Sequence, residues 1–254
     1  FWNKFLYDIK AVPTSEPYKK RTSHGMILGP DGEKMSKSRG NVINPDDMVS
    51  AYGADAYRLY QMFMGPFDQA IPWDPKGIEG TSRFLGRVWK LGSGNMLSSI
   101  TGIKGNDSRK HIPASFEVLL HKTIKKVSED IESMRFNTAV SSLMILSNEF
   151  EKNKEFGINN YEILLKLLSP FAPHVTEELW HKIHNSKFSI RNSIHNEKWP
   201  KFDAKKIKEE NFELVVQING KVRDKFEAPT DISENDAKLL TLERENVKKY
   251  ISNK

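Results

Sequence analysis

The chain has 254 residues, a net charge of +6, 38% hydrophobic residues and no cysteine. This composition is typical of a globular protein with a polar surface, and no apolar run approaches the roughly 20 residues that a membrane helix needs. We therefore expect no membrane partner. The absence of cysteine excludes disulfides, thiolate metal sites and cysteine nucleophiles, and it agrees with a reducing compartment, so we expect a cytoplasmic protein.

The charge surplus is spread evenly along the chain, so it favours a polyanionic partner only mildly. The first residue is Phe1, and the segment "FWNKFLYDIK" lacks the layout of a signal peptide. We interpret this start as the edge of a longer chain.

The first 66 residues combine short helices with turns. A strand is predicted over residues 26–28, before the turn "GPDG" and a mobile loop. Asn44 is placed to N-cap the next helix, Pro45 suits its first position, and Gly53 is predicted to end it in the left-handed conformation. A second helix should follow and end at the pair Gly65 and Pro66.

Residues 78–186 predict a bundle of four or five helices. Apolar residues recur at steps of three and four, which defines one buried helix face. Asn137 is placed to cap the helix after this stripe, and Pro170 and Pro173 should divide the last two helices. Residues 92–113 predict a loop that crosses the bundle, and residues 187–211 a polar linker. The stripe consists of Leu120, Ile124, Val127, Ile131 and Met134.

The last segment predicts a hairpin followed by a helix. The run "FELVVQINGKVRDKF" alternates around Asn219 and Gly220, the strongest short-range signal for a tight hairpin. Ser233 and Asp236 resemble a capping box at the start of a helix. The expected fold is thus mainly α with a small α/β part.

The loop "GEKMSKSRGN" carries the first candidate site. Handling of a phosphate requires mobile backbone, several donors and a long cationic side chain, which Lys34, Ser36, Lys37 and Ser38 provide together. The spacing is not that of a Walker A loop. A solvated basic turn is an equally good interpretation from charge alone.

The second strand of the hairpin carries the other candidate site. Strict alternation would place Lys221, Arg223 and Lys225 on one face, about 7 Å apart along the strand. Such a ladder could follow a phosphate backbone. A solvated strand face that prevents edge pairing explains the same pattern.

Two further groups favour structural roles. Three histidines and two glutamates fall at steps of three to four, so several could share one helix side, but their order matches neither zinc motif, and we expect capping, packing and solvent exposure and no metal. Four aromatic residues at helical spacing could stack on bases, but burial in the core is the better interpretation. The first group is His174, Glu177, Glu178, His181 and His184. The second is Phe84, Trp89, Phe150 and Trp180.

The string "KMSKS" is the signature of class I aminoacyl-tRNA synthetases, and the chain most resembles the leucyl enzymes. The segment from "GMILGPDGEKMSKSRGN" to "QAIPW" resembles the part that leaves their catalytic domain. "MRFNTAVSSLMILSNEF" and "LLSPFAPHVTEELW" resemble their anticodon-binding domain, and "VVQINGKVRDKF" their C-terminal domain. Because these motifs occur in the family's order, the resemblance covers nearly the whole chain.

The resemblance implies three parts. Residues 1–76 would be the end of the catalytic domain and a stem-contact region with the KMSKS loop. Residues 77–197 would be the class Ia anticodon-binding helical bundle. Residues 198–254 would be a linker and a small C-terminal α/β domain that binds tRNA through Lys221, Arg223 and Lys225.

The resemblance also implies roles in catalysis. ATP, accompanied by Mg²⁺, would contact Lys34, Met35, Ser36, Lys37 and Ser38. Lys34 and Lys37 would be catalytic, and Lys37 would stabilise the departing pyrophosphate electrostatically. The full enzyme would be a leucine–tRNA ligase that binds ATP, leucine and leucine tRNA, and we expect a monomer.

The H-I-G-H signature that completes the family's ATP site is absent from this sequence, and the C-terminal end is shorter than usual in the family. We therefore expect the isolated chain to show no leucine-dependent ATP–pyrophosphate exchange. The alternative is a stand-alone tRNA-binding accessory module derived from a synthetase. An intact KMSKS string disfavours this alternative, because such a module has no evident use for an ATP loop.

Overall fold

The computed structural model describes residues 1–93, 113–153, 156–207, 211–229 and 232–251. In this part of the chain the strands are β1 Ile27–Leu28, β2 Ile71–Pro72, β3 Asn211–Ile218 and β4 Lys221–Pro229. The helices are α1 Trp2–Asp8, α2 Pro45–Tyr52, α3 Ala54–Phe63, α4 Pro75–Leu91, α6 Ala114–Glu132, α7 Phe136–Lys152, α8 Ile158–Leu168, α9 Pro173–Ile183, α10 Ala204–Ile207, α11 Glu234–Glu243 and α12 Glu245–Ile251. The 3₁₀ turns are η1 Lys37–Arg39, η3 Ile190–Asn192 and η4 Ile194–Asn196.

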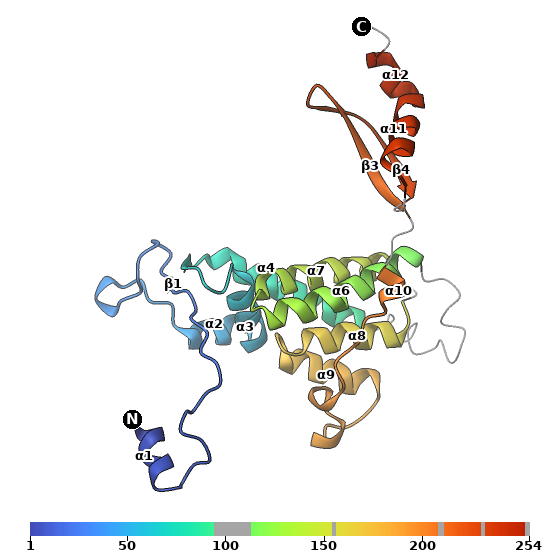
Figure 1. Ribbon diagram of the computed structural model, residues 1–254. Helices are drawn as coiled ribbons and strands as arrows, with labels where there is room; N and C mark the ends of the chain where they lie inside the picture. The colour runs from blue at the N-terminus through green and yellow to red at the C-terminus, as the bar shows by residue number, and fades with distance from the viewer. Residues whose placement is uncertain (94–112, 154–155, 208–210, 230–231, 252–254) are drawn as a thin grey trace.

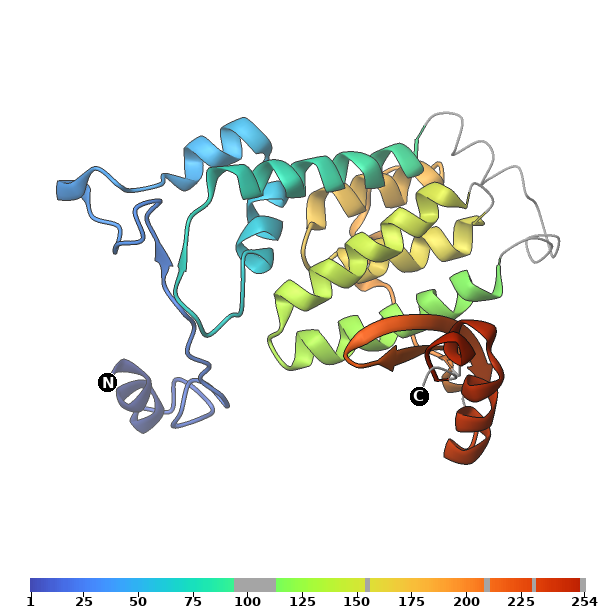
Figure 2. The same ribbon diagram turned by 90° about the horizontal axis from the view of Figure 1, so that it is seen from above.

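A helical bundle of α4, α6, α7, α8 and α9 forms the centre of the molecule, and α3 packs against it (Figure 1). The N-terminal segment, with β1 and the loop after it, extends from one end of this bundle (Figure 2). The hairpin β3–β4 with α11 and α12 projects from the bundle as a separate unit. The predicted fold class, mainly α with a small hairpin-and-helix part, is confirmed.

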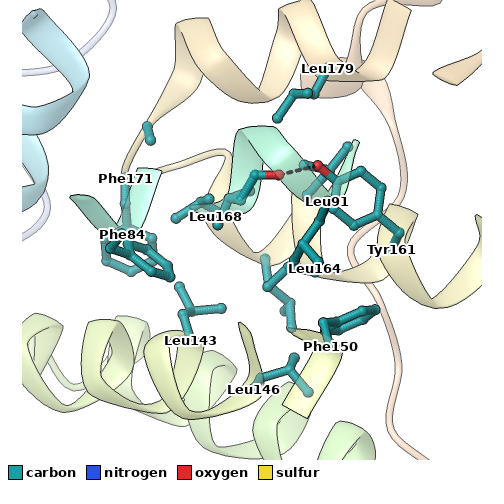
Figure 3. Close-up of a cluster of buried hydrophobic side chains, with 14 of the residues drawn as sticks. Phe84, Leu91, Leu143, Leu146, Phe150, Tyr161, Leu164, Leu168, Phe171 and Leu179 are labelled. Atoms are coloured by element: carbon teal, nitrogen blue, oxygen red, sulfur yellow. Dashed lines mark hydrogen bonds between the residues drawn. The ribbon is translucent and has the colours of Figure 1, made fainter. Parts of the chain in front are cut away.

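The core of the bundle is apolar and continuous (Figure 3). Phe84, Leu143, Phe150 and Leu164 are each at most 1% exposed. The hydroxyl of Tyr161 donates a hydrogen bond to the carbonyl oxygen of Val88 at 2.8 Å, so the one polar group of this side chain is satisfied within the core.

Three of the four aromatic residues that we expected in the core are buried there, and the fourth packs against it. Phe84, Phe150 and Trp180 are buried, and Trp89 is half-buried with the ammonium of Lys182 4.7 Å from the centre of its ring. The periodicity therefore identified the inner faces of the helices correctly.

The turn between α6 and α7 differs from the prediction. Arg135, and not Asn137, is the N-cap of α7, and no side chain caps this helix. The turn is instead fixed by Asp130, which is fully buried and accepts hydrogen bonds from Lys126, Arg135 and Thr138. Burial alone would raise the pKa of Asp130, but these donors outweigh it and hold the pKa below its ordinary value.

The first turn of α9 is capped from another helix. Its own N-cap residue, Ala172, has no side-chain acceptor. The buried carboxylate of Asp55, in α3, accepts a hydrogen bond from the backbone N–H of Val175 at 2.6 Å and lies 2.7 Å from Nδ1 of His174. A guanidinium N–H of Arg58 also donates to the carbonyl of Pro170 at 3.2 Å. These bonds join α3, which follows the KMSKS loop through α2, to the bundle.

The predicted polar linker is more ordered than we expected. Residues 187–207 contain η3, η4 and α10 and lie on the bundle. The carboxylate of Glu177 accepts from the hydroxyl of Ser193 at 2.9 Å and from the N–H of Ile194 at 3.2 Å. The indole N–H of Trp199 donates to the hydroxyl of Ser128 at 2.8 Å. The polar composition of this segment predicted a linker, because the residues that bond to its polar groups lie elsewhere in the sequence. The predicted crossing loop, residues 92–113, lies almost entirely outside the described residues.

The local signals at three element ends are confirmed. The side chain of Asn44 accepts from the N–H of Asp46 at the start of α2, and the side chain of Ser233 accepts from the N–H of Asp236 at the start of α11. Asn219 and Gly220 both have positive φ, as a tight hairpin turn requires. Gly53 ends α2 with a positive φ, but its ψ of 155° is not the predicted left-handed helical conformation. Among the described residues, no helix has the length and apolar character to span a membrane.

Candidate functional site

The KMSKS loop begins at a two-residue parallel pairing of β1 with β2. The N–H of Gly29 donates to the carbonyl of Glu33 at 2.7 Å, and Lys34 returns to form an isolated bridge with Leu28. The turn η1 follows and ends at Gly40, whose φ of 67° favours glycine. The sequence therefore folds here into a compact hairpin-like loop with defined ends.

Three of the predicted ATP-binding residues have partners within the protein. Met35 is half-buried and packs against the small apolar cluster of Tyr60, Trp73 and Ile78, so it anchors the loop. The hydroxyl of Ser36 lies 2.8 Å from that of Ser38, which is exposed.

The ammonium groups of Lys34 and Lys37 are exposed. Within the described residues, neither forms an ion pair, whereas the neighbouring Arg39 pairs with Glu33 at 3.1 Å. The loop therefore presents two uncompensated cations beside two hydroxyl groups. This arrangement can stabilise the negative charge of a polyphosphate.

Asn41 and Asp31 fix the shape of the loop, and our sequence analysis missed both. The amide oxygen of Asn41 accepts from the N–H of Ser36 at 2.8 Å, and its NH₂ group donates to the carboxylate of Asp31 at 3.0 Å. The hydrogen bond from Asn41 and that from the N–H of Glu33 lower the pKa of the Asp31 carboxyl. The only signal in the sequence was a pair of short polar residues at the two ends of a glycine-bounded loop.

The second predicted site has a different geometry from the one we expected. The register of the hairpin shifts between Val216 and Gln217, which lie opposite Asp224 and Val222. Arg223 is therefore an extra residue, a β-bulge, with no partner in β3. Bulges interrupt the alternation of side chains along a strand.

The prediction that Lys221, Arg223 and Lys225 share one face is therefore wrong. Lys221 lies opposite Ile218 and Lys225 lies opposite Val215. Since residues 215 and 218 of one regular strand point to opposite faces, the two lysines also point to opposite faces.

The three basic residues also have different partners. The guanidinium of Arg223 lies 4.1 Å from the centre of the Tyr250 ring and donates to its hydroxyl at 3.1 Å. The ammonium of Lys225 pairs with Glu213 at 3.2 Å across the hairpin. Lys221 is exposed and, in the described part of the chain, has no ion pair. Of the predicted ladder, Lys225 alone has an ion pair among the described residues, and Lys221 alone has no side-chain partner there.

Residues at and after the bulge bond to the C-terminal helices. Asp224 accepts hydrogen bonds from Arg244 and Asn246, and Arg244 lies over the ring of Phe226 at 4.7 Å. Hydrogen bonding from Arg244 outweighs desolvation and lowers the pKa of Asp224. Arg223 and Asp224 therefore hold the hairpin to α12, a role that the alternating pattern did not predict.

The histidines in and after α9 bond to protein groups. His181 lies between Glu177 and Ser186, at 2.8 and 2.9 Å, and Nδ1 of His184 lies 2.8 Å from the carbonyl oxygen of Trp180. Among the residues that the structure describes, no group of three or more His, Cys, Asp or Glu could hold a metal ion.

Comparisons with known proteins agree with this arrangement. Residues 2–74, which contain the KMSKS loop, match the family of class I tRNA synthetases for I, L, M and V. Residues 115–238 match the anticodon-binding domain of tRNA ligases. The fold and the loop thus define a class I synthetase region that is followed by a helical anticodon-binding domain. The chain belongs to the class I aminoacyl-tRNA synthetases of the I, L, M and V group.

Two solved structures are similar. One is a ternary complex of Agrobacterium radiobacter K84 agnB2 LeuRS with tRNA and LeuAMS, with 30% identity, a TM-score of 0.73 and coverage of 99% of this chain and 32% of that one. The other is Mycobacterium tuberculosis methionyl-tRNA synthetase with methionyl-adenylate, with 18% identity, a TM-score of 0.49 and coverage of 61% and 36%. The chain thus spans about a third of the length of either protein, and the second likeness is too low to support an inference.

Proposed function

We propose that the chain is part of a leucine–tRNA ligase, which activates leucine with ATP and transfers it to leucine tRNA. The observation that carries this proposal is the pair of uncompensated ammonium groups, Lys34 and Lys37, on a fixed loop. The amino acid is inferred from the likeness to a LeuRS, which covers 99% of this chain at 30% identity.

In this proposal, Lys34 and Lys37 bind the triphosphate of ATP, and Lys37 stabilises the negative charge that develops on the leaving pyrophosphate. Ser36 and Ser38 donate hydrogen bonds to phosphate oxygens. Such stabilisation is effective because the donors are already in place when the charge appears.

ATP would bring Mg²⁺, but both carboxylates of the loop already have partners within it. The carboxylate of Asp31 is bonded to Asn41, and that of Glu33 is paired with Arg39. We therefore assign these lysines and serines to the phosphates and no residue to the metal.

We propose that leucine tRNA contacts both the helical bundle and the C-terminal unit. Of the three predicted residues, Lys221 is free of side-chain partners among the described residues, whereas Arg223 and Lys225 would first have to leave Tyr250 and Glu213. The same proposal includes the predicted domain boundaries at residues 76/77 and 197/198, a monomeric state and a cytoplasmic location. The second candidate, an accessory tRNA-binding module, would need Lys221 but not Lys34 or Lys37.

Amino acid-dependent ATP–pyrophosphate exchange tests the first candidate. The protein at its native length should catalyse exchange with leucine and not with isoleucine, methionine or valine. Lys37→Ala should reduce kcat by about 100-fold, the scale of a lost oxyanion-type contact. A Lys37→Ala protein with unchanged kcat would contradict the assigned role, and exchange with another of these amino acids would contradict the specificity. The isolated chain should show no exchange.

Binding of tRNA tests the second element of the proposal. Lys221→Glu should weaken binding of leucine tRNA and reduce the slope of log K against log [salt] by about one or more. Lys19→Glu, which changes an exposed lysine of the N-terminal segment, is a matched control for charge. Equal effects of the two substitutions would remove Lys221 from the interface.

A further inference from the structure

We propose that Asn41, together with Asp31, is the positioning residue of the KMSKS loop and holds Lys34 and Lys37 in place before ATP binds. This inference rests on the proposed function, because it concerns the same loop. It adds two residues that make no contact with phosphate themselves. They act through the backbone of the residues that do.

Both the oxygen and the NH₂ group of the Asn41 amide are bonded within the loop. Its oxygen accepts from the N–H of Ser36 at 2.8 Å. Its NH₂ group donates to both carboxylate oxygens of Asp31, at 3.1 and 3.0 Å, and to the carbonyl of Lys34 at 3.3 Å. An asparagine side chain offers two N–H donors and a carbonyl oxygen with two lone pairs, so both donors and one of the lone pairs are occupied by the loop. One side chain thus fixes backbone on both sides of Met35.

The backbone at Gly29 leaves room for this pair. A Cβ atom at Gly29 would lie 2.6 Å from Oδ1 of Asp31 and 2.8 Å from Nδ2 of Asn41, both closer than real contacts allow. Gly29 is buried, and its N–H is already bonded to the carbonyl of Glu33. The close approach therefore gives an independent reason for a glycine before the loop.

The consequence concerns the two lysines. The carbonyl of Lys34 is held by Asn41, while its ammonium is exposed and unpaired among the described residues. The bonded N–H of Ser36, the N-cap of η1, fixes where the turn that carries Lys37 begins. The backbone is therefore ordered while the cationic groups stay available, which reduces the ordering that ATP binding would otherwise require.

The first experiment measures the loop itself by amide hydrogen exchange and by trypsin cleavage after Lys34 and Lys37. Asn41→Ala should accelerate both by about tenfold, the factor that one lost hydrogen bond supports. Asn41→Asp should do the same, because a second carboxylate repels Asp31. The double variant D31N/N41D swaps the two side chains, so it again places an amide beside a carboxylate and keeps an acceptor for the N–H of Ser36. The hydrogen-exchange rate of the Ser36 amide should therefore return to within about threefold of the wild-type rate. Glu33→Gln, which weakens the neighbouring Arg39 pair, is the matched control and should leave the Ser36 amide unchanged.

The second experiment separates positioning from stability in the protein at its native length. Asn41→Ala should lower kcat of ATP–pyrophosphate exchange by about tenfold and leave the KM for leucine unchanged, with partial recovery in the D31N/N41D protein. A merely structural role would instead reduce the active fraction, and the paired substitution would show no recovery in kcat per folded molecule.

The outcomes distinguish the two proposals. An unchanged rate of hydrogen exchange at the Ser36 amide in both Asn41 variants would overturn the positioning role. Faster hydrogen exchange with an unchanged kcat for ATP–pyrophosphate exchange would also overturn it. If the wild-type protein catalyses no ATP–pyrophosphate exchange with leucine, the proposed function is wrong. Hydrogen exchange at Ser36 and trypsin cleavage alone then decide whether Asn41 orders the loop.

Discussion

Replacement of Asp55 by alanine should destabilise the bundle, because Asp55 caps a helix that cannot cap itself. The substitution removes the acceptor for the N–H of Val175 and the partner of His174. It also removes a negative charge from the positive end of α9. The vacated site is buried, so the N–H of Val175 would lose its partner without full access to water.

The expected loss of unfolding free energy is about 2 to 3 kcal/mol. Loss of an N-cap contributes about 1 kcal/mol, and a hydrogen bond to a charged group about 1.5 to 3 kcal/mol, with overlap between the two. Asp55→Asn keeps an acceptor oxygen but no charge, so we expect a smaller loss of about 1 kcal/mol.

Urea denaturation followed by far-UV circular dichroism measures this loss. The m-value should stay constant, so the midpoint alone should shift. Asp47→Ala is the control, because Asp47 is exposed in the first turn of α2. A shift in Asp55→Ala no larger than that of Asp47→Ala would refute the idea that α3 caps α9.

Three further predictions concern other polar groups. Tyr161→Phe removes the hydrogen bond to Val88 and should lower the free energy of unfolding by about 1 kcal/mol, with no change in the helical circular dichroism spectrum; an unchanged midpoint would contradict a contribution from this bond. Asp130→Ala should lower the free energy of unfolding by about 3 kcal/mol, because alanine leaves Lys126, Arg135 and Thr138 without their shared acceptor. Asp130→Asn should lower it by less, and equal losses in the two variants would argue against this acceptor role. The pKa of Asp31 is lowered, so the stabilisation that its carboxylate gives the loop should be complete above its ordinary value of 3.8 and be lost only as pH falls through the lowered pKa. The NMR shift of the Asn41 side-chain amide should report this titration, and a midpoint at or above 3.8 would contradict the bond.

Local signals in the sequence predicted much of the fold. The apolar spacing located α6 and its inner face, Pro173 marked the start of α9, and Asn219 with Gly220 marked the hairpin. Each of these features depends on residues within a few positions of one another. Propensity, capping and turn chemistry act over that range, which is why the sequence alone was sufficient.

The features that the sequence did not predict depend on backbone register or on distant partners. The bulge at Arg223 has no residue signature, and it places Lys221 and Lys225 of the predicted ladder on opposite faces. The cap on α9 comes from Asp55, 120 positions before Val175. Asn41 has a short-range role, but its ten-residue separation from Asp31 hid the pair.

The connection between α3 and α9 also bears on how such proteins can be recombined. Ala56 and Leu59 of α3 belong to the same buried cluster as the bundle helices, and Asp55 and Arg58 bond the turn before α9 and its first residues. A chimera that takes residues from 77 onward from a relative would therefore separate α9 from Asp55, which caps it. The junction should instead lie before Gly53, so that α3 is inherited together with the helices that it supports.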